Sequence, residues 1–124
     1  MGEKGHFVQP TIFANVQGDM RIAKEEIFGP VLCAQSFSSD DFEIIAKRAN
    51  DTNYGLSGSV WSQDISTAHK MAMLIDAGQV SINCHAAVDP AIPFGGNKQS
   101  GWGREFGQEG LEPYLKTKAT TVIF

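Results

Sequence analysis

Two spacings of apolar residues alternate along this chain, and they predict short strands separated by amphipathic helices. Residues 10–16 predict a strand that the polar stretch 17–19 closes, and the charged run 19–26 predicts a brief helix capped by Asp19. Residues 31–37 are nearly all apolar. This pattern predicts a strand buried on both faces, as in a parallel sheet.

Apolar residues at helical spacing predict two further helices. The first begins after the capping stretch 38–41 and ends within 50–55. Its inward positions are Phe42, Ile45, Ala46 and Ala49. The second begins at Asp64 or Ser66, and its inward positions are Ala68, Met71, Ala72 and Ile75. Gly78 follows it as a left-handed C-cap.

Strands are predicted at 56–61 and 79–84, one on each side of the second helix. Strands and helices in this alternation are typical of crossovers in a parallel sheet. A long loop over 85–102, a helix over 104–114 and a last strand over 118–124 complete the chain. The predicted fold class is α/β, with a mostly parallel sheet and flanking helices in one unit.

Composition narrows the class of protein. The chain has 124 residues, of which 42% are apolar and 19% charged, as expected of one globular domain. Its net charge of −4 and its scattered basic residues argue against a nucleic-acid partner. No apolar run approaches the roughly 20 residues that a membrane helix needs, so no membrane segment is expected.

Cysteine and histidine placement gives two further expectations. Cys33 and Cys84 lie far apart and outside any CxxC pattern, which is typical of reduced thiols and favours a cytoplasmic protein. His6, His69 and His85 lack the spacing of metal ligands, so no metal site is expected. The first residues contain no apolar secretory signal.

The stretch 24–31, Lys-Glu-Glu-Ile-Phe-Gly-Pro-Val, is the first candidate for a binding function. Proline fixes its own φ and disfavours helical geometry in the residue before it, so Gly29-Pro30 forces a turn. The turn presents the Glu26 carboxylate and the Phe28 ring at the start of a predicted strand. Taken alone, the stretch is better explained as a structural turn.

A second stretch, 93–105, changes this interpretation; its sequence is Pro-Phe-Gly-Gly-Asn-Lys-Gln-Ser-Gly-Trp-Gly-Arg-Glu. Together the two stretches resemble the NAD(P)-dependent aldehyde dehydrogenase family, in that family's order and at about its spacing. The resemblance extends from about Gly5 to Phe124 and matches the C-terminal portion of such an enzyme. The segments 83–89 and 98–105 resemble the phenylacetaldehyde dehydrogenases in particular.

The resemblance implies roles for four residues. Glu26 would hydrogen-bond the nicotinamide ribose, which suits a carboxylate because it accepts two hydrogen bonds at once. Phe28 would pack beside the nicotinamide of NAD or NADP. Val88 and Phe94 would line the tunnel for a hydrophobic aldehyde substrate. Without the resemblance, Phe94 is better explained as a core aromatic that anchors a loop.

The resemblance implies no catalytic residue in this chain. The family's nucleophilic thiol lies in a Gly-Gln-x-Cys context and its base in a Leu-Gly-Gly-Lys context, and the sequence contains neither. Cys33 and Cys84 are therefore interpreted as structural. The glycines at 101, 103 and 107 do not follow a strand, so they are not a dinucleotide fingerprint. Lys98 and Arg104 are interpreted as loop-fixing or interface ions.

The resulting interpretation is a piece of an aldehyde dehydrogenase. Residues 1–115 form the C-terminal part of its catalytic domain, and 116–124 form an oligomerisation strand. The alternative is a non-catalytic fragment that self-associates through uncovered sheet edges, giving a homo-oligomer. A free nucleotide-binding domain is disfavoured because no phosphate loop follows a strand.

Overall fold

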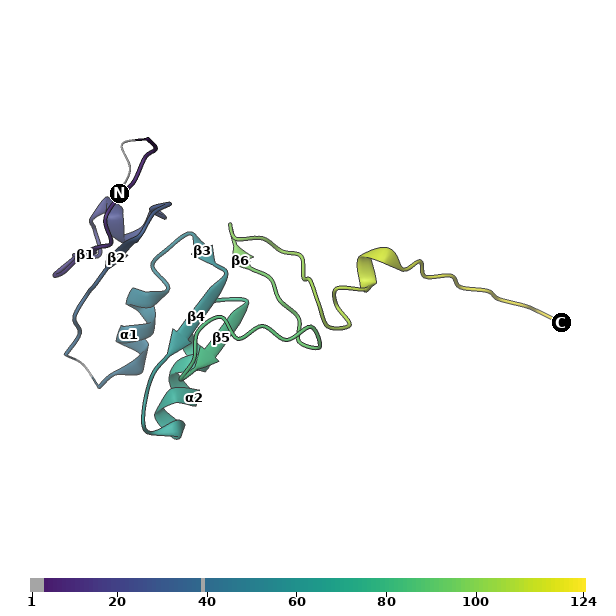
Figure 1. The fold of residues 1–124 in the computed structure, drawn as a ribbon. Helices are drawn as coiled ribbons and strands as arrows, with labels where there is room; N and C mark the ends of the chain where they lie inside the picture. The colour runs from purple at the N-terminus through teal and green to yellow at the C-terminus, as the bar shows by residue number, and fades with distance from the viewer. Residues whose placement is uncertain (1–3, 39) are drawn as a thin grey trace. The chain divides into compact units, whose positions relative to one another are not determined.

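A computed structural model describes residues 4–38 and 40–124 and is drawn in Figure 1. The chain divides into two compact units, Met1–Asn53 and Tyr54–Phe124. Each unit contains one parallel strand pair, and the second also contains an antiparallel pair. The predicted α/β class is confirmed, but the single continuous sheet is not formed.

The first unit is built on strands β1 (Thr11–Phe13) and β2 (Val31–Cys33), which pair in parallel with Thr11 opposite Val31. A short 3-10 helix, η1 (Arg21–Ala23), lies between them in sequence. The helix predicted over 19–26 is therefore only three residues long, and no side chain caps it. Beyond β1, the Val16 N–H donates to the Ala34 carbonyl oxygen at 3.1 Å, and Val16 itself is buried.

Helix α1 (Phe42–Ala49) confirms the first predicted amphipathic helix. Its N-cap is Asp41, whose Oδ1 accepts from the backbone N–H groups of Glu43 and Ile44 at 2.9 and 3.4 Å. Of its inward positions, Ala46 is buried. Ser39, in the predicted capping stretch, lies outside the described residues.

The second unit contains the predicted strand–helix–strand crossover. Strands β4 (Ser57–Val60) and β5 (Gln79–Ile82) pair in parallel, with Ser57 opposite Gln79 and Val60 opposite Ile82. Helix α2 (Ile65–Leu74) connects them and packs on the pair (Figure 1). Ala68 is fully buried, and Met71 is 8% exposed.

A second small sheet follows in the same unit. Strand β3 (Tyr54–Gly55) pairs antiparallel with β6 (Asn97–Lys98), so Gly55 lies opposite Asn97. Phe94 and Glu105 form an isolated antiparallel bridge with both hydrogen bonds at 2.7 Å. A 3-10 helix, η2 (Glu112–Tyr114), comes near the end of the chain.

Two predictions for the last part of the chain are wrong. Residues 104–114 do not form a continuous helix, because Glu105 pairs with Phe94 and the backbone at Phe106 and Gly107 has positive φ (61° and 58°). Residues 118–124 contain no strand, so the predicted last strand is not formed and the oligomerisation strand over 116–124 is not supported. A strand requires a hydrogen-bonded partner, and no described segment pairs with this one.

Two finer predictions also differ from the structure. The strand predicted over 31–37 is confined to β2, and Leu32 within it is 58% exposed rather than buried. The exposure of Leu32 means that no described element covers the face of β2 on which it lies. Gly78 does not have the positive φ of a left-handed C-cap; its backbone instead closely approaches that of Gly95.

The cap of α2 gives a testable pH dependence. Asp64 accepts hydrogen bonds from the Thr67 hydroxyl at 2.6 Å and the Ser66 N–H at 3.0 Å, and these bonds lower the pKa of its carboxyl. A lowered pKa in the folded state means that the stabilisation is present above the unfolded pKa, near 3.8, and is lost as pH falls through the folded value.

We expect Asp64→Ala to lower the melting temperature at neutral pH by several degrees, with a smaller difference from the parent chain in acid. Thermal melts followed by circular dichroism at a series of pH values measure this. Asp64→Asn is the matched control, because it keeps a capping oxygen but does not titrate. A constant difference between Asp64→Ala and the parent at every pH would contradict the prediction.

Candidate functional site

The turn that carries Glu26 and Phe28 lies in the first unit, between η1 and β2. Two tight hydrogen bonds shape it, from the Gly29 N–H to the Ile27 carbonyl oxygen and from the Val31 N–H to the Gly29 carbonyl oxygen, both at 2.8 Å. The Thr11 N–H donates to the Pro30 carbonyl oxygen at 2.9 Å, which fixes the turn to β1. The turn is therefore held at its β2 end.

Glu26 and Phe28 are both presented to solvent on this turn. Phe28 is 93% exposed, and Glu26 is also exposed. Within residues 4–38 and 40–124, no group donates a hydrogen bond to the Glu26 carboxylate or forms an ion pair with it. A carboxylate with its oxygens available and an aromatic ring with both faces open are suited to a ligand that carries hydroxyl groups and a flat ring.

The charged residues that precede Glu26 are already paired. The Arg21 guanidinium donates to the Glu25 carboxylate at 2.8 Å, and this bond raises the pKa of Arg21 and lowers that of Glu25. Lys24 Nζ lies 3.1 Å from Asp51 Oδ2. The two adjacent glutamates therefore differ: Glu25 is bonded to Arg21, whereas Glu26 has no partner among the described residues.

The loop that carries Val88 lies in the second unit and leaves the carboxyl end of β5. Ligands of α/β proteins bind beyond the carboxyl ends of parallel strands. The Asn83 side chain joins this end to Ser62, accepting from its N–H and donating to its carbonyl oxygen, both at 2.9 Å. Asn83 has a φ of 54°, which turns the chain away from the strand.

Two more side-chain bonds hold the same loop. The Ser59 hydroxyl on β4 lies 3.0 Å from His85 Nδ1, and the Gln79 side-chain amide donates to the Ala87 carbonyl oxygen at 2.8 Å. Val88 follows and is 49% exposed. The loop is therefore fixed at its base while Val88 remains accessible.

Phe94 lies farther along the same unit and is half-buried, with its backbone bridged to Glu105. The four residues selected from the sequence thus fall into two pairs. Glu26 and Phe28 belong to the first unit, and Val88 and Phe94 to the second.

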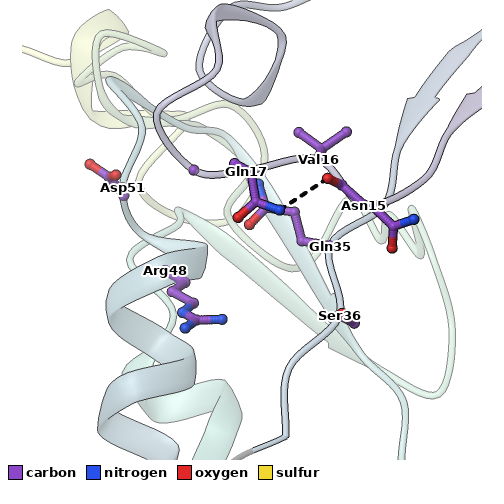
Figure 2. Close-up of a pocket in the computed structure, with 8 residues that line it drawn as sticks. Asn15, Val16, Gln17, Gln35, Ser36, Arg48 and Asp51 are labelled. Carbon is purple, nitrogen blue, oxygen red and sulfur yellow. Dashed lines mark hydrogen bonds between the residues drawn. The ribbon is translucent and has the colours of Figure 1, made fainter.

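A polar pocket in the first unit was not expected from the sequence. It encloses about 300 Å³ and is lined by residues from the ends of β1 and β2 and from the end of α1, namely Asn15, Val16, Gln17, Gly18, Gln35, Ser36, Arg48 and Asp51. Figure 2 shows Arg48 on α1 across the pocket from Ser36, and the hydrogen bond from the Gln17 side chain to the Asn15 carbonyl oxygen. No sequence motif marks these residues, because they come together from three separate segments.

Cys33 lines a neighbouring pocket of the first unit with Phe37 and Ile45. Both Cys33 and Cys84 are free thiols and half-buried. Among the described residues no cluster of His, Cys, Asp or Glu has the arrangement of a metal site. Every helix in the described part of the chain is too short or too polar to cross a membrane.

A parallel strand pair crossed by a helix, with an anchored loop at the carboxyl end, defines the second unit as part of an α/β protein. The comparison with protein families is more specific, since the model described as "Aldehyde dehydrogenase family" matches residues 1–120. This chain belongs to the aldehyde dehydrogenase family.

Individual relatives support the assignment. The chain is 51% identical over 121 residues to aldehyde dehydrogenase 1A1 of Gallus gallus, covering 98% of this chain and 23% of that protein. It is 49% identical over 119 residues to the mitochondrial aldehyde dehydrogenase family 2 member B4 of Arabidopsis thaliana, covering 96% and 22%. The chain thus spans about a quarter of the length of these relatives.

Solved structures agree in fold and add a cofactor. Betaine aldehyde dehydrogenase of Staphylococcus aureus in complex with NAD+ has a TM-score of 0.85 and 44% identity, covering 90% of this chain and 22% of that one. A mutant of the P. syringae indole-3-acetaldehyde dehydrogenase AldA, in complex with NAD+, has a TM-score of 0.85 and 46% identity, covering 92% and 23%. NAD+ is therefore a cofactor of this family.

Proposed function

We propose that this chain is a segment of an aldehyde dehydrogenase that oxidises an aldehyde to a carboxylic acid with NAD+ or NADP+. The observation that carries the proposal is the anchored turn at 26–28. It presents a carboxylate that has no partner among the described residues and a phenylalanine that is 93% exposed. The family assignment supports it, as do the NAD+ complexes of similar structures.

Glu26 and Phe28 hold the nicotinamide end of the cofactor in this proposal. The Glu26 carboxylate accepts hydrogen bonds from the two ribose hydroxyls, and the Phe28 ring packs on the flat nicotinamide. The bound cofactor supplies a hydride acceptor for the aldehyde carbon. The chain's own contribution is to orient that acceptor rather than to form or break bonds.

Val88 and Phe94 line the approach of the substrate. Both are apolar and come from the loop system that follows β5, where a ligand of a parallel strand pair is expected. We propose a hydrophobic aldehyde as the substrate, with an aromatic aldehyde of the phenylacetaldehyde type as its more specific form. The similarity to an indole-3-acetaldehyde dehydrogenase supports an aromatic substrate.

The isolated 124-residue chain can be used to test the proposal, because its sequence contains neither the Gly-Gln-x-Cys segment of the family's nucleophile nor the Leu-Gly-Gly-Lys segment of its base. We expect no oxidation of phenylacetaldehyde and no saturable NAD+ binding by calorimetry, with a cooperative thermal melt. One turn of the cofactor site offers too few contacts to offset the translational and rotational entropy that NAD+ loses on binding. Aldehyde oxidation above the buffer control would contradict this assignment of roles.

Exposed apolar side chains favour the alternative of a self-associating fragment. Leu32 on β2, Phe37 after it and Ile44 on α1 are all exposed in the first unit, together with many others. Light scattering after size-exclusion chromatography of the same preparation distinguishes the alternatives. A monomer without NAD+ binding supports the segment interpretation, and a stable oligomer of defined size supports the fragment interpretation.

A further inference from the structure

We propose that Arg104, Asn97 and Asp76 form a positioning network that fixes the turn 93–96, and with it the Phe94 side chain. The effect of this network on the substrate rests on the proposed function, in which Phe94 lines the substrate path. The network itself follows from hydrogen bonds within the second unit, and it identifies the turn that Arg104 holds and the partners through which it does so.

Arg104 is the centre of the network. Its Nη1 donates to the Gly96 carbonyl oxygen at 2.7 Å and to the Gly103 carbonyl oxygen at 2.9 Å, and its Nη2 donates to Asn97 Oδ1 at 2.8 Å. The bonds to Gly96 and Asn97 are partly buried. A planar guanidinium with fixed donors holds such diverging acceptors in one geometry, which a lysine ammonium does not.

Asn97 connects Arg104 to the end of helix α2. While its Oδ1 accepts from Arg104, its Nδ2 donates to Asp76 Oδ1 at 3.2 Å. Lys98 Nζ lies 3.3 Å from Asp76 Oδ2, and together these contacts lower the pKa of Asp76. Asp76 lies two residues beyond Leu74, where α2 ends, so the turn is joined to the most buried helix of the unit.

The turn is also held from its other side. The N–H groups of Phe94 and Glu105 each donate to the other residue's carbonyl oxygen at 2.7 Å. Arg104 lies next to Glu105 in sequence, so its side chain and this backbone bridge act on the same short segment. The Ser100 hydroxyl adds a third tie by accepting from the Gly55 N–H at 3.0 Å.

Loss of the Arg104 guanidinium leaves two partly buried acceptors, the Gly96 carbonyl oxygen and Asn97 Oδ1, without their donor. Gly96 is buried, and water does not replace a charged donor there without opening the turn. The expected result is local: the turn 93–96 opens more often, while the β4–β5 pair, which has no bond to Arg104, remains as it is. Phe94 then samples several positions instead of one.

Amide hydrogen exchange of the full 124-residue chain, read by NMR, tests the network directly. Arg104→Lys is expected to accelerate exchange at the Phe94 and Glu105 amides by roughly 10- to 100-fold. The Gln79 and Asn83 amides, which bond across to Leu56 and Val60, serve as internal references and should change by less than about twofold. Arg21→Lys, at an exposed arginine of the first unit, is the matched control.

Kinetics of a full-length enzyme that carries this segment provide the second readout. Arg104→Lys is expected to raise the KM for phenylacetaldehyde about 10-fold with the KM for NAD+ unchanged, whereas simple destabilisation reduces active enzyme and leaves both KM values as they were. Unchanged exchange at Phe94 and Glu105 overturns the network. Faster exchange with an unchanged aldehyde KM supports the network and overturns instead the proposed role of Phe94.

Discussion

Replacing Gly78 by alanine is expected to destabilise the second unit by about 3 kcal/mol, among the larger effects of a single methyl group. An added Cβ would overlap the Gly95 carbonyl oxygen and lie 2.8 Å from the Gly95 carbonyl carbon. Both atoms are backbone, so no side-chain rotation relieves the overlap. Either the start of β5 or the turn that carries Phe94 has to move.

Tryptophan fluorescence during urea unfolding measures the effect on this unit, because both tryptophans, Trp61 and Trp102, lie within it. Gly103→Ala is the matched control, since a Cβ there meets no atom within 4 Å and the substitution should change stability by no more than about 0.5 kcal/mol. Equal unfolding midpoints for the two variants would show that the close contact between Gly78 and Gly95 is not a constraint.

Replacing Glu26 by glutamine in a full-length enzyme that carries this segment is expected to weaken NAD+ binding by roughly 10- to 100-fold. The carboxylate accepts two hydrogen bonds with its charge, whereas the amide keeps one neutral acceptor, and a charged hydrogen bond contributes about 1.5–3 kcal/mol. Because Glu26 has no protein partner among the described residues, the loss falls on the ligand rather than on the fold.

Calorimetric titration with NAD+ measures the change, and Glu25→Gln is the control. Glu25 is adjacent in sequence but is already bonded to Arg21 at 2.8 Å, so its replacement should leave NAD+ affinity unchanged. The two substitutions remove the same charge from neighbouring positions, which eliminates any effect of net charge. Equal losses of affinity in both variants would exclude a specific contact from Glu26.

The helices of this fold could be predicted because their signals are local. The stretch 38–41 was expected to cap the first helix, and Asp64 or Ser66 to begin the second. In the structure the caps are Asp41 and Asp64, which both accept backbone N–H groups. The apolar positions at helical spacing include the buried residues Ala46, Ala68 and Met71. The crossover from β4 through α2 to β5 was predicted for the same reason, since its pieces are close together in sequence.

The errors arose where a segment's structure depends on a distant partner. A helix was predicted over 104–114 although Gly107, Gly110 and Pro113 disfavour one. In the structure Glu105 instead pairs with Phe94, and the positive φ of Phe106 is incompatible with a helix. The apolar run at 31–37 indicates a strand buried on both faces, yet Leu32 on β2 is 58% exposed, so one face is left uncovered among the described residues. Sequence spacing does not show whether the covering elements are present.

The candidate site was predicted by resemblance rather than by physics. Glu26, Phe28, Val88 and Phe94 were selected from motifs, and the structure describes their exposure and anchoring without testing their roles. The Arg104 network was only partly foreseen, as a loop-fixing charge. Its acceptors, the Gly96 carbonyl oxygen and the Asn97 side chain, become visible only once the turn is folded.

The sparse interior of this chain has a consequence for any measurement of its stability. Only Val16, Ala46, Ala68 and Met71 are buried apolar residues among those described, while large side chains such as Leu32 and Phe37 face solvent. A partner that binds the folded form alone raises the melting temperature in proportion to the logarithm of its concentration. The thermostability of this segment is therefore a property shared with whatever covers it, and a value obtained on the chain alone is a lower limit.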